Sequence, residues 1–550
     1  MIACSYDRPL QLYALLESAY KHLCGIEHII VIYRASSDAF DALYDQVQRD
    51  FPETLFLKQN PSPKNQDFKP LLLKAIAASQ SDYVILAADD CVVIDDIDVT
   101  RAITLLKQKN AYAFYFNLGA NITYTPKQGA NRSSQPYQKD AETICWNFGD
   151  STGVWAQSAM IDMTLFKKSR LLEELSALSF TTPPTLSNAL HALHQRQYKN
   201  QVGQPEHAEA PQQHQVQKRG LAPLHAQVVT LYFNSTHRCR KPELFYDYSP
   251  LDFARMFTMG FKIDIDELYG TDTPQQVIQL LPHFVLRHKN PDYRHKHIVV
   301  IIPSHNNQNW YQKNLDSVFM QDYDNYDVIY IDDRSSDGTG DLVEKYIQEK
   351  GKNNVRLIKN TERCLALKNI YTGVHMCQDD DIVALLDGDD WYAHPHVLSL
   401  INDIYQDSQV WLTYGQLAHY PDNTKQTCQP YPEQDNAEYD FRMSHSFPVA
   451  PRTFYAGLFW HIDKRDLMYR GKFFEMTSDP AIMLPMLEMA RNNHFRFIPI
   501  VLYFCNDAPG VVHDRTTNGK LQLQLHNFIN GLPSYDAIAD YHQDGPLIPD

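Results

Sequence analysis

Residues 382–391 read Ile-Val-Ala-Leu-Leu-Asp-Gly-Asp-Asp-Trp, an apolar run followed at once by a cluster of aspartates. A short run of Val, Ile and Leu is typical of a buried strand, and Asp and Gly favour the turn that ends it. The carboxylates of Asp387 and Asp389 should therefore emerge together at one edge of a sheet. Hard oxygen ligands at alternate positions suit Mg²⁺ or Mn²⁺, although an acidic surface turn or a helix N-cap would use the same residues.

Short apolar strands alternate with amphipathic helices around this stretch. The sequence predicts strands at 297–303, 327–331, 355–358 and 382–386, and helices at 310–321, 340–350 and 364–376. This alternation predicts an α/β fold with a mostly parallel, Rossmann-related sheet and helices on both faces. Ligands of such sheets bind beyond the carboxyl ends of the strands, which is where the polar clusters of this sequence fall.

The beginning of the chain repeats this pattern at a distance of 299 residues. The shift aligns about ninety residues without a gap and places Asp90 on Asp389. An internal repeat of this length predicts two homologous domains in tandem. We expect them at residues 1–290 and 291–550, meeting in the polar, proline-containing stretch 288–296.

Residues 192–226 break the pattern of the first domain. They are rich in Gln, His and Ala and have little apolar periodicity, which predicts an exposed insertion or mobile loop. Five histidines in or beside this stretch could suggest a metal site, but their irregular spacing favours a solvated polar loop.

The composition indicates an acidic globular protein. Fifty basic and 66 acidic residues give the 550-residue chain a formal net charge of −16, which disfavours nucleic-acid binding through a general basic field. No apolar run approaches the ~18 residues of a membrane span, and no secretory signal is visible at the N-terminus. The nine cysteines are scattered and never spaced Cys-x-x-Cys, which favours reduced thiols. We expect a cytoplasmic protein without a membrane span.

Four motifs of the second repeat resemble those of the family 2 glycosyltransferases. They are Pro-Ser-His-Asn at 303–306, Asp-Asp-Arg-Ser-Ser-Asp-Gly-Thr at 332–339, Ala-Leu-Lys-Asn at 366–369 and Asp-Gly-Asp at 387–389. The nucleotide-binding GT-A fold of that family carries Pro-x-Tyr-Asn, Asp-Asp-Gly-Ser-x-Asp-Gly-Thr, Ala-Arg-Asn and Asp-x-Asp in the same order. His305, Arg334 and Lys368 depart from the usual residues without removing a required charge. The resemblance is dense over 297–392 and loose over 392–515.

The resemblance implies two tandem GT-A-like domains and a metal-dependent, inverting transfer from a nucleotide-sugar, which we expect to be UDP-linked, to a glycan or other hydroxyl acceptor. The nucleotide-binding residues that it implies are Pro303, Asn306, Asp332, Asp333, Lys368 and Asp387. A carboxylate at Asp332 or Asp333 can accept the N3–H of uracil or bind a ribose, and a solvated turn is the alternative. Lys368 could meet the diphosphate as a point charge, or be an exposed helical lysine.

The resemblance also suggests the catalytic groups. Residues 475–479, Glu-Met-Thr-Ser-Asp, place Asp479 at the position of the catalytic base, with Ser where Glu usually precedes it. An inverting transfer needs such a carboxylate to take the proton of the acceptor hydroxyl, and a helix N-cap is the compatible alternative. Mn²⁺ or Mg²⁺ held by Asp389 and His513 would offset charge on the departing nucleoside diphosphate. Trp460 could stack on an acceptor sugar or be a core aromatic, and His513 could equally be structural.

The first repeat has lost several of these groups. In the 299 register, Tyr-Arg at 33–34 replaces the expected uracil-binding aspartates and Ala88 replaces the first aspartate of the metal pair. Asp89 and Asp90 remain, and Asp150 could substitute for the base. Two alternatives stay open: a second transferase site, or a nucleotide-independent scaffold that presents the acceptor to the second domain.

Three other functions are alternatives to a single-site transferase. A bifunctional enzyme resembling polysaccharide synthases would use both domains. A sugar nucleotidyltransferase normally has a Gly-rich, Arg-containing loop after its first strand, whereas residues 304–308 read Ser-His-Asn-Asn-Gln. A non-catalytic carbohydrate-binding scaffold is disfavoured by the complete acidic set of the second repeat.

Overall fold

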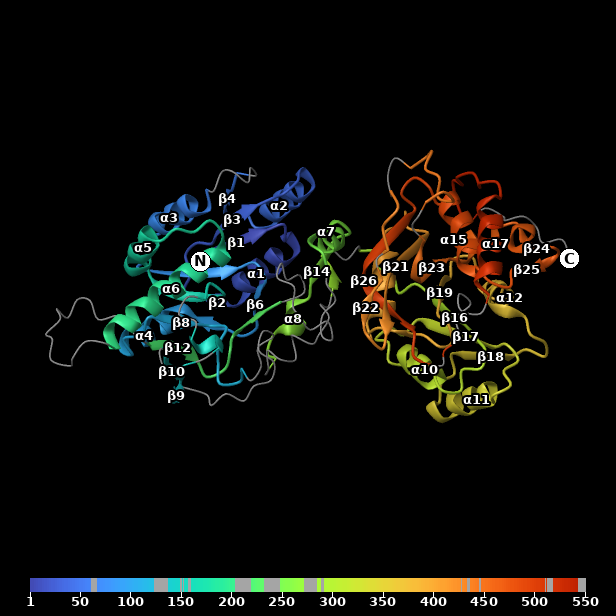
Figure 1. Cartoon of the computed structure of the whole chain (residues 1–550), viewed down its shortest axis with the longest axis horizontal. Coiled ribbons are helices and arrows are strands. Elements are labelled where there is room, and N and C mark those ends of the chain that lie inside the picture. The colour runs from blue at the N-terminus through green and yellow to red at the C-terminus, as the bar shows by residue number, and fades with distance from the viewer. Residues whose placement is uncertain are drawn as a thin grey trace. The chain divides into compact units, whose positions relative to one another are not determined.

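A computed structural model gives the fold of the chain. It describes residues 1–60, 67–122, 137–148, 151, 153–156, 160–202, 219–231, 248–271, 284–287, 291–426, 428–432, 436–444, 447–509, 511 and 518–542. The chain divides into two compact units, Met1–Arg287 and His288–Asp550. Figure 1 shows the first in blue to green and the second in yellow-green to red, each with its own sheet and helices. Within the described ranges, no helix is long and apolar enough to cross a membrane.

The second unit is built on a mixed sheet of order β18-β17-β16-β19-β23-β21-β26-β20, with β22 paired to β21. Its strands are β16 (Ile298–Ser304), β17 (Tyr326–Asp332), β18 (Val355–Lys359), β19 (Ile382–Leu385), β20 (Trp391–Tyr392), β21 (Leu412–Tyr420), β22 (Thr424–Lys425), β23 (Val449–Tyr455) and β26 (Phe495–Asn506). The first four strands of this order are parallel, whereas β23 runs antiparallel to β19. Every residue of β16 is buried, as expected for a parallel strand with both faces covered.

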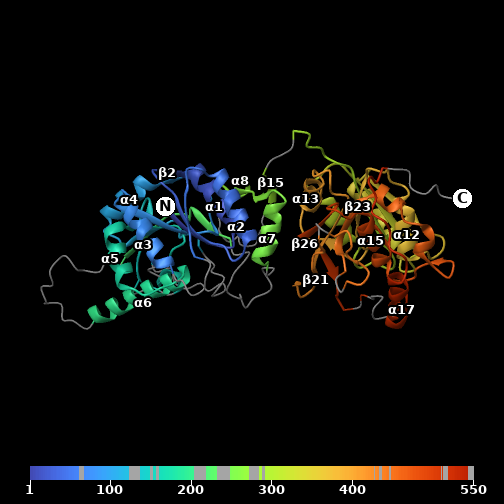
Figure 2. The same cartoon turned by 90° about the horizontal axis from the view of Figure 1, so that it is seen from above.

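Helices cover both faces of this sheet, as Figures 1 and 2 show. They are α10 (Tyr311–Phe319), α11 (Thr339–Lys350), α12 (Leu365–Val374), α13 (Val397–Ile404), α14 (Ala456–Trp460), α15 (Ser478–Met489) and α17 (Gly519–Asn530), and a small hairpin, β24 (Met468–Tyr469) and β25 (Lys472–Phe473), precedes α15. Because β16, β17 and β19 are parallel, the polar segments that follow them lie at one edge of the sheet, which positions the candidate site.

The first unit repeats this sheet in the order β4-β3-β1-β5-β11-β8-β12-β10-β9. Its strands are β1 (Ile2–Tyr6), β3 (Ile30–Arg34), β4 (Leu55–Lys58), β5 (Tyr83–Ala88), β8 (Ala113–Tyr115), β9 (Tyr137–Lys139), β10 (Thr143–Asn147), β11 (Thr164–Lys167) and β12 (Arg219–Pro223). As in the second unit, four parallel strands are followed by an antiparallel one. The parallel arrangement predicted from the sequence thus forms the centre of each sheet, and the strands beyond it are mixed.

Helices and short strand pairs complete the first unit. The helices are α1 (Pro9–His22), α2 (Asp38–Asp50), α3 (Phe68–Ala78), α4 (Val99–Gln108), α5 (Lys168–Ala177), α6 (Pro183–Val202), α7 (Pro250–Thr258) and α8 (Ile265–Leu268). The short pairs are β2 (Leu23–Cys24) with β7 (Ile97–Asp98), β6 (Cys91–Val93) with β13 (Val228–Thr230), and β14 (Phe261–Ile263) with β15 (Phe284–Leu286). Helices α3, α5 and α6 contribute buried apolar side chains to one core cluster with the central strands.

The register between the two sheets follows the 299-residue repeat, with one exception. Ile2 pairs with Ile30, and 299 residues later Ile301 pairs with Ile329. The edge strands differ, because the partner of Ile30 in β4 and the partner of Ile329 in β18 are 301 residues apart. The prediction of an ungapped alignment was therefore wrong here: the second domain has two additional residues between β17 and β18 and two fewer before β19. Surface connections absorb such changes because the buried strands hold the register.

The predicted insertion at 192–226 was wrong at both of its ends. Helix α6 continues to Val202, and β12 lies inside the sheet between β8 and β10. The sequence did not reveal the second half of α6 because this half is polar, whereas the fully buried apolar side chains of the helix, Leu186 and Leu190, come earlier. His194 is buried and pairs with Glu174. Residues 203–218 lie outside the described part of the chain.

Candidate functional site

The acidic turn, residues 386–390, follows β19 at the carboxyl edge of the second sheet. Gly388 is pressed against the end of β16, so that a Cβ at this position would come within 2.5 Å of the Ser304 Cβ. Asn314 of α10 donates hydrogen bonds to the carbonyl oxygens of Asp387 and Asp390, at 2.9 and 2.7 Å. The backbone of the turn is therefore held in place from two sides.

The three carboxylates of the turn have different surroundings. Asp390 is buried and accepts hydrogen bonds from the Tyr503 hydroxyl and the Asn506 backbone N–H, both at 2.8 Å. The side chain of Asp387 is 46% exposed. Burial and the neighbouring charge of Asp387 raise the pKa of Asp389 to about 6. Asp387 and Asp389 are thus the pair available to a ligand, and Asp390 ties the turn to β26.

Arg452 connects this turn to the candidate base. It lies in β23 opposite Leu385, and its side chain is only 5% exposed. Its Nη2 is 3.4 Å from Asp387 Oδ2, and its Nη1 forms an ion pair with Asp479 Oδ1. Burial alone would lower the pKa of the guanidinium, but Asp479 and Asp387 raise it, so Arg452 stays charged. The sequence prediction missed Arg452; the available signal was a lone arginine within the apolar strand 449–455.

Asp479 lies in the first turn of α15. The helix begins at Ser478, and its N-cap is Thr477, which has a left-handed φ of 63° and makes no capping hydrogen bond through its side chain. The alternative in which Asp479 itself caps the helix is therefore not the arrangement of the structure. Its carboxylate is 49% exposed, so an incoming hydroxyl can reach it.

The two aspartates at the end of β17 are buried but differently engaged. Asp333 accepts hydrogen bonds from the backbone N–H groups of 364–365, at 2.7 and 2.8 Å, and from the Asn360 amide at 2.9 Å. Although burial alone would raise the pKa of Asp333, these bonds lower it. Asp332 Oδ2 accepts the backbone N–H of Ser335 at 3.2 Å, whereas its buried Oδ1 has no hydrogen-bond partner within the described residues. Asp332 thus keeps an acceptor for a ligand, and Asp333 fixes the loop before α12.

The loops after β16 and β17 form one rim beside these aspartates. Pro303 is buried at the end of β16. Asn306, with a φ of 55°, donates its backbone N–H to Ser335 Oγ at 2.9 Å and accepts the backbone N–H of Ser336 at 2.8 Å. Lys368 of α12 forms an ion pair with Glu362 at 3.3 Å and is half exposed. Its amine would therefore have to leave Glu362 to meet a diphosphate.

Residues 299–457, which include β16 to β23 and Arg452, match the family model described as Glycosyl transferase family 2. The chain carries a glycosyl transferase family 2 domain. This finding confirms the resemblance drawn from the motifs and the expected GT-A-like α/β fold. Asp479 lies beyond the matched residues, so its role as the catalytic base stays a prediction.

The family 2 domain is similar to proteins of known type. Glycosyltransferase GlyA of Streptococcus pneumoniae is 28% identical over 109 residues, which are 20% of this chain and 15% of GlyA. The structure of S. aureus TarS 1-349 in complex with UDP-GlcNAc is 17% identical, with a TM-score of 0.29 over 39% of this chain and 60% of that one. The mannosyltransferase PcManGT from Pyrobaculum calidifontis, in complex with GDP-Man and Mn²⁺, is 18% identical, with a TM-score of 0.29 over 44% and 63%. The chain thus covers less than two thirds of each of these relatives.

One predicted residue of the described part of the chain, Trp460, does not join the site. Trp460 ends α14, which follows β23 and therefore lies at the amino edge of β19. Gly457 of this helix donates its backbone N–H to the Asp379 carbonyl just before β19. The Trp460 ring is beside His375, with ring centroids 6.4 Å apart. The predicted stacking of Trp460 on an acceptor was wrong, because an antiparallel strand carries the chain to the opposite edge. His513 and Asp150 lie outside the described residues.

The corresponding turn of the first domain is closed by an arginine. Arg8 Nη1 lies 3.2 Å from Asp89 Oδ1 and 3.2 Å from Asp90 Oδ2. Asp89 is buried and also accepts a hydrogen bond from Ser5 Oγ at 2.9 Å. Burial and the charge of Asp89 raise the pKa of Asp90 to about 7. The two acids predicted for a second site are therefore close together, but a cation of the chain itself contacts both.

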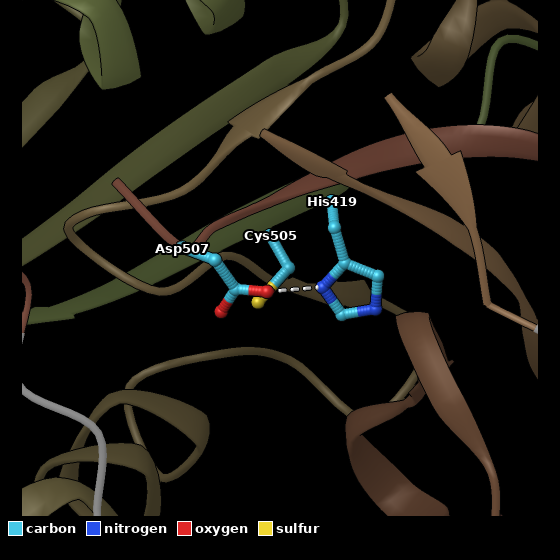
Figure 3. Close-up of side chains that lie close together, drawn as sticks. All are labelled: His419, Cys505 and Asp507. Atoms are coloured by element: carbon cyan, nitrogen blue, oxygen red, sulfur yellow. Dashed lines mark hydrogen bonds and ion pairs between the residues drawn. The ribbon is translucent and has the colours of Figure 1, made fainter. Parts of the chain in front are cut away.

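A further polar group lies at the ends of β21 and β26 and was not predicted. His419 pairs with Cys505 across the two strands, and its Nδ1 is 2.6 Å from Asp507 Oδ2. Figure 3 shows the three side chains converging, and their candidate ligand atoms lie within 4.8 Å of one another. Such donors can bind Zn²⁺. Burial, reinforced by nearby carboxylates, raises the pKa of the Cys505 thiol, so the geometry is equally that of a His–Asp pair beside a protonated thiol.

Proposed function

We propose that the second domain is a metal-dependent, inverting glycosyltransferase that moves a sugar from a UDP-linked donor to a hydroxyl of a glycan or other acceptor. The observation that carries this proposal is the bridge of Arg452 between Asp387 and Asp479. It brings the acidic turn and the candidate base side by side, although 92 residues separate them in the sequence. A transferase needs these two groups on either side of the reacting anomeric carbon.

The donor base is proposed to bind at Asp332. A buried acceptor without a partner costs roughly 1–3 kcal/mol, and the N3–H of uracil would satisfy the free Oδ1. Asp333 positions the adjacent loop, and the Pro303–Asn306 segment forms the rim over which the nucleotide would lie. Lys368, once released from Glu362, is the candidate partner of the diphosphate.

Asp387 and Asp389 are the proposed metal ligands. The raised pKa of Asp389 fits this role, because two crowded carboxylates gain from a cation between them and the diphosphate. Mn²⁺ or Mg²⁺, when bound there, offsets the negative charge of the departing nucleoside diphosphate. His513 stays a prediction as a third ligand.

Asp479 is the proposed general base. Arg452 holds one of its oxygens, so the carboxylate is oriented toward the acidic turn while its exposed side can accept the proton of the acceptor hydroxyl. Bond formation from that hydroxyl oxygen to the anomeric carbon then accompanies departure of the nucleoside diphosphate. If the acceptor oxygen attacks the face of the anomeric carbon opposite the departing nucleoside diphosphate, the configuration at that carbon inverts.

Donor hydrolysis is the experiment that tests this function. The full chain is incubated with a panel of UDP- and GDP-linked sugars, with Mn²⁺ or with a chelator, and release of free nucleotide is measured. We expect Mn²⁺-dependent release from a UDP-sugar, lost in Asp389→Ala. Nucleotide release that depends on neither the metal nor Asp389, or a preference for GDP-sugars, would contradict the proposal.

The cytoplasmic location also stays a prediction, supported by the eight cysteines that are free among the described residues.

A further inference from the structure

The two domains place an arginine at different points of the same framework. Leu86 and Leu385 are equivalent in the 299 register, and the residue opposite each in the antiparallel strand is Thr164 in β11 and Arg452 in β23. The first domain therefore lacks the buried arginine that pairs with Asp387 and Asp479 in the second. The buried Thr164 Oγ1 has no hydrogen-bond partner within the described ranges.

The first domain instead has its arginine in the loop after β1. Arg8 corresponds to Asn307, whose short side chain donates a hydrogen bond to Ser304 Oγ at 3.0 Å and stays beside β16. Arg8 reaches past that position, and one guanidinium nitrogen lies 3.2 Å from both Asp89 and Asp90. A single cationic group that contacts two carboxylates occupies the place that a bridging metal ion would take between them.

Without the guanidinium of Arg8, the acidic side chains of this turn would form a cation site. Asp90 Oδ1 is buried and has no hydrogen-bond partner in the part of the chain that the structure describes. The charge of Asp162 also acts on Asp90. Two or three acids thus converge here. Among the described residues, the mostly buried guanidinium of Arg8 contacts both Asp89 and Asp90, and its charge would repel a divalent ion at this distance.

We infer that Arg8 is a built-in replacement for the divalent cation in the first domain, which keeps the acidic turn of a donor site but is closed to metal. Arg8 offsets part of the negative charge of Asp89 and Asp90 without any ion, so the turn does not need Mn²⁺ or Mg²⁺ to hold its two acids together. Replacing Arg8 with the residue of the second domain, Arg8→Asn, should open a divalent-cation site at Asp89 and Asp90. The inference concerns the first domain only and does not require the second to be active.

The test counts bound Mn²⁺ on the full chain by electron paramagnetic resonance, with circular dichroism and thermal melting as measures of folding. We expect Arg8→Asn to bind one more Mn²⁺ per chain than the wild type and the double variant Arg8→Asn, Asp90→Asn to lose it. Arg49→Asn is the matched control, because it removes an exposed arginine of α2 in the same domain. A folded Arg8→Asn chain without additional Mn²⁺ would overturn the inference.

A second measurement does not depend on the folding of Arg8→Asn. Asp90→Asn in the otherwise wild-type chain should leave the number of bound Mn²⁺ ions unchanged, because Arg8 already excludes the ion. Loss of one Mn²⁺ in this variant would show a metal in the first domain and overturn the inference. Loss of Mn²⁺ in Asp389→Ala reports on the second domain alone. A failure of the proposed function can therefore be told apart from a failure of the inference about Arg8.

Discussion

The three aspartates of the acidic turn, Asp387, Asp389 and Asp390, have the same side chain but different surroundings. Asp390 is buried against Tyr503 and Asn506, Asp387 is engaged by Arg452, and Asp389 is held near Asp387 with a raised pKa. Substitution should therefore affect folding at one position and ligand binding at another. Arg452 is equally specific, because a buried guanidinium is tolerated only where acids neutralise it.

Asp389→Ala should abolish transfer and Mn²⁺-dependent UDP binding while leaving the fold intact. The change removes a proposed metal ligand at a partly exposed turn whose backbone is held by Asn314 and Gly388. Isothermal calorimetry with UDP and Mn²⁺, together with a transfer assay, measures both effects. Asp390→Asn is the matched comparison and should lower the melting temperature, because that carboxylate accepts two buried hydrogen bonds. Activity of Asp389→Ala above about a tenth of wild type would contradict the metal assignment.

Asp479→Asn should lower kcat by about 10²–10⁴-fold, the usual contribution of a general base, with UDP binding little changed. Asparagine keeps the size of the side chain and can still accept a hydrogen bond from Arg452, but it cannot take a proton. Steady-state kinetics and UDP calorimetry separate the two effects. An equal loss of UDP binding would mean that Asp479 acts through structure.

At the scale of elements, the site depends on where strands begin and end. The pairing of β23 with β19 delivers Arg452 to the acidic turn, and the same pairing sends α14 and Trp460 to the other edge. At that amino edge, His297 before β16 bridges Asp381 before β19 at 2.7 Å and Asp327 of β17 at 3.3 Å. This cluster ties the three central parallel strands together at their starts.

The stability of the second domain should therefore fall as pH rises through the His297 titration. The hydrogen bond to Asp381 raises the pKa of His297 above its ordinary 6.5, despite the opposing effect of burial. The folded state thus holds this proton more tightly than the unfolded one, so the added stability is complete below pH 6.5 and is lost as pH passes the raised pKa. With a third of the side chain exposed, the effect should be about 1 kcal/mol or less.

Urea unfolding of wild type and His297→Gln across this pH range measures the effect. The midpoint of the wild type should decrease with rising pH more than that of the variant. Exposed His295, which pairs with Asp324, provides the matched control, and His295→Gln should keep the wild-type pH profile. Identical profiles for wild type and His297→Gln would show that the bridge contributes nothing.

At the scale of the whole molecule, two domains share a strand order and a register but not a site. The second has an acceptor atom at Asp332 without a partner among the described residues, and the pair Asp387 and Asp389 at its turn, where Arg452 contacts Asp387. The first has Tyr33 at the position equivalent to Asp332, and Arg8 contacts both Asp89 and Asp90. The framework is therefore repeated in the two domains, whereas these side chains are not. The first domain still buries a core of its own, and its contribution to stability or acceptor binding stays a prediction.

The full chain should consequently bind one UDP per molecule in the presence of Mn²⁺. The first domain has no carboxylate at the uracil position and no open metal pair, so only the second should respond. Calorimetry on the intact chain gives the stoichiometry, and Asp332→Asn should weaken that single site. Two UDP sites of similar affinity would overturn this prediction and indicate a bifunctional transferase that uses Asp89 and Asp90.

The sequence by itself determined the features that depend on residues close together in the chain. Apolar runs predicted the central parallel strands, Asp and Gly predicted the turn after β19, and a constant spacing predicted the repeat, because strand burial and turn geometry depend on residues close in the chain. Tertiary structure alone decided which of these residues meet. The antiparallel return of β23 brought Arg452 to Asp387 and Asp479 and carried Trp460 away, because strand direction sets the edge at which a side chain lies. The contact of Arg8 with Asp89 and Asp90 also depends on the length of the arginine side chain and on its burial, which a local sequence pattern does not show.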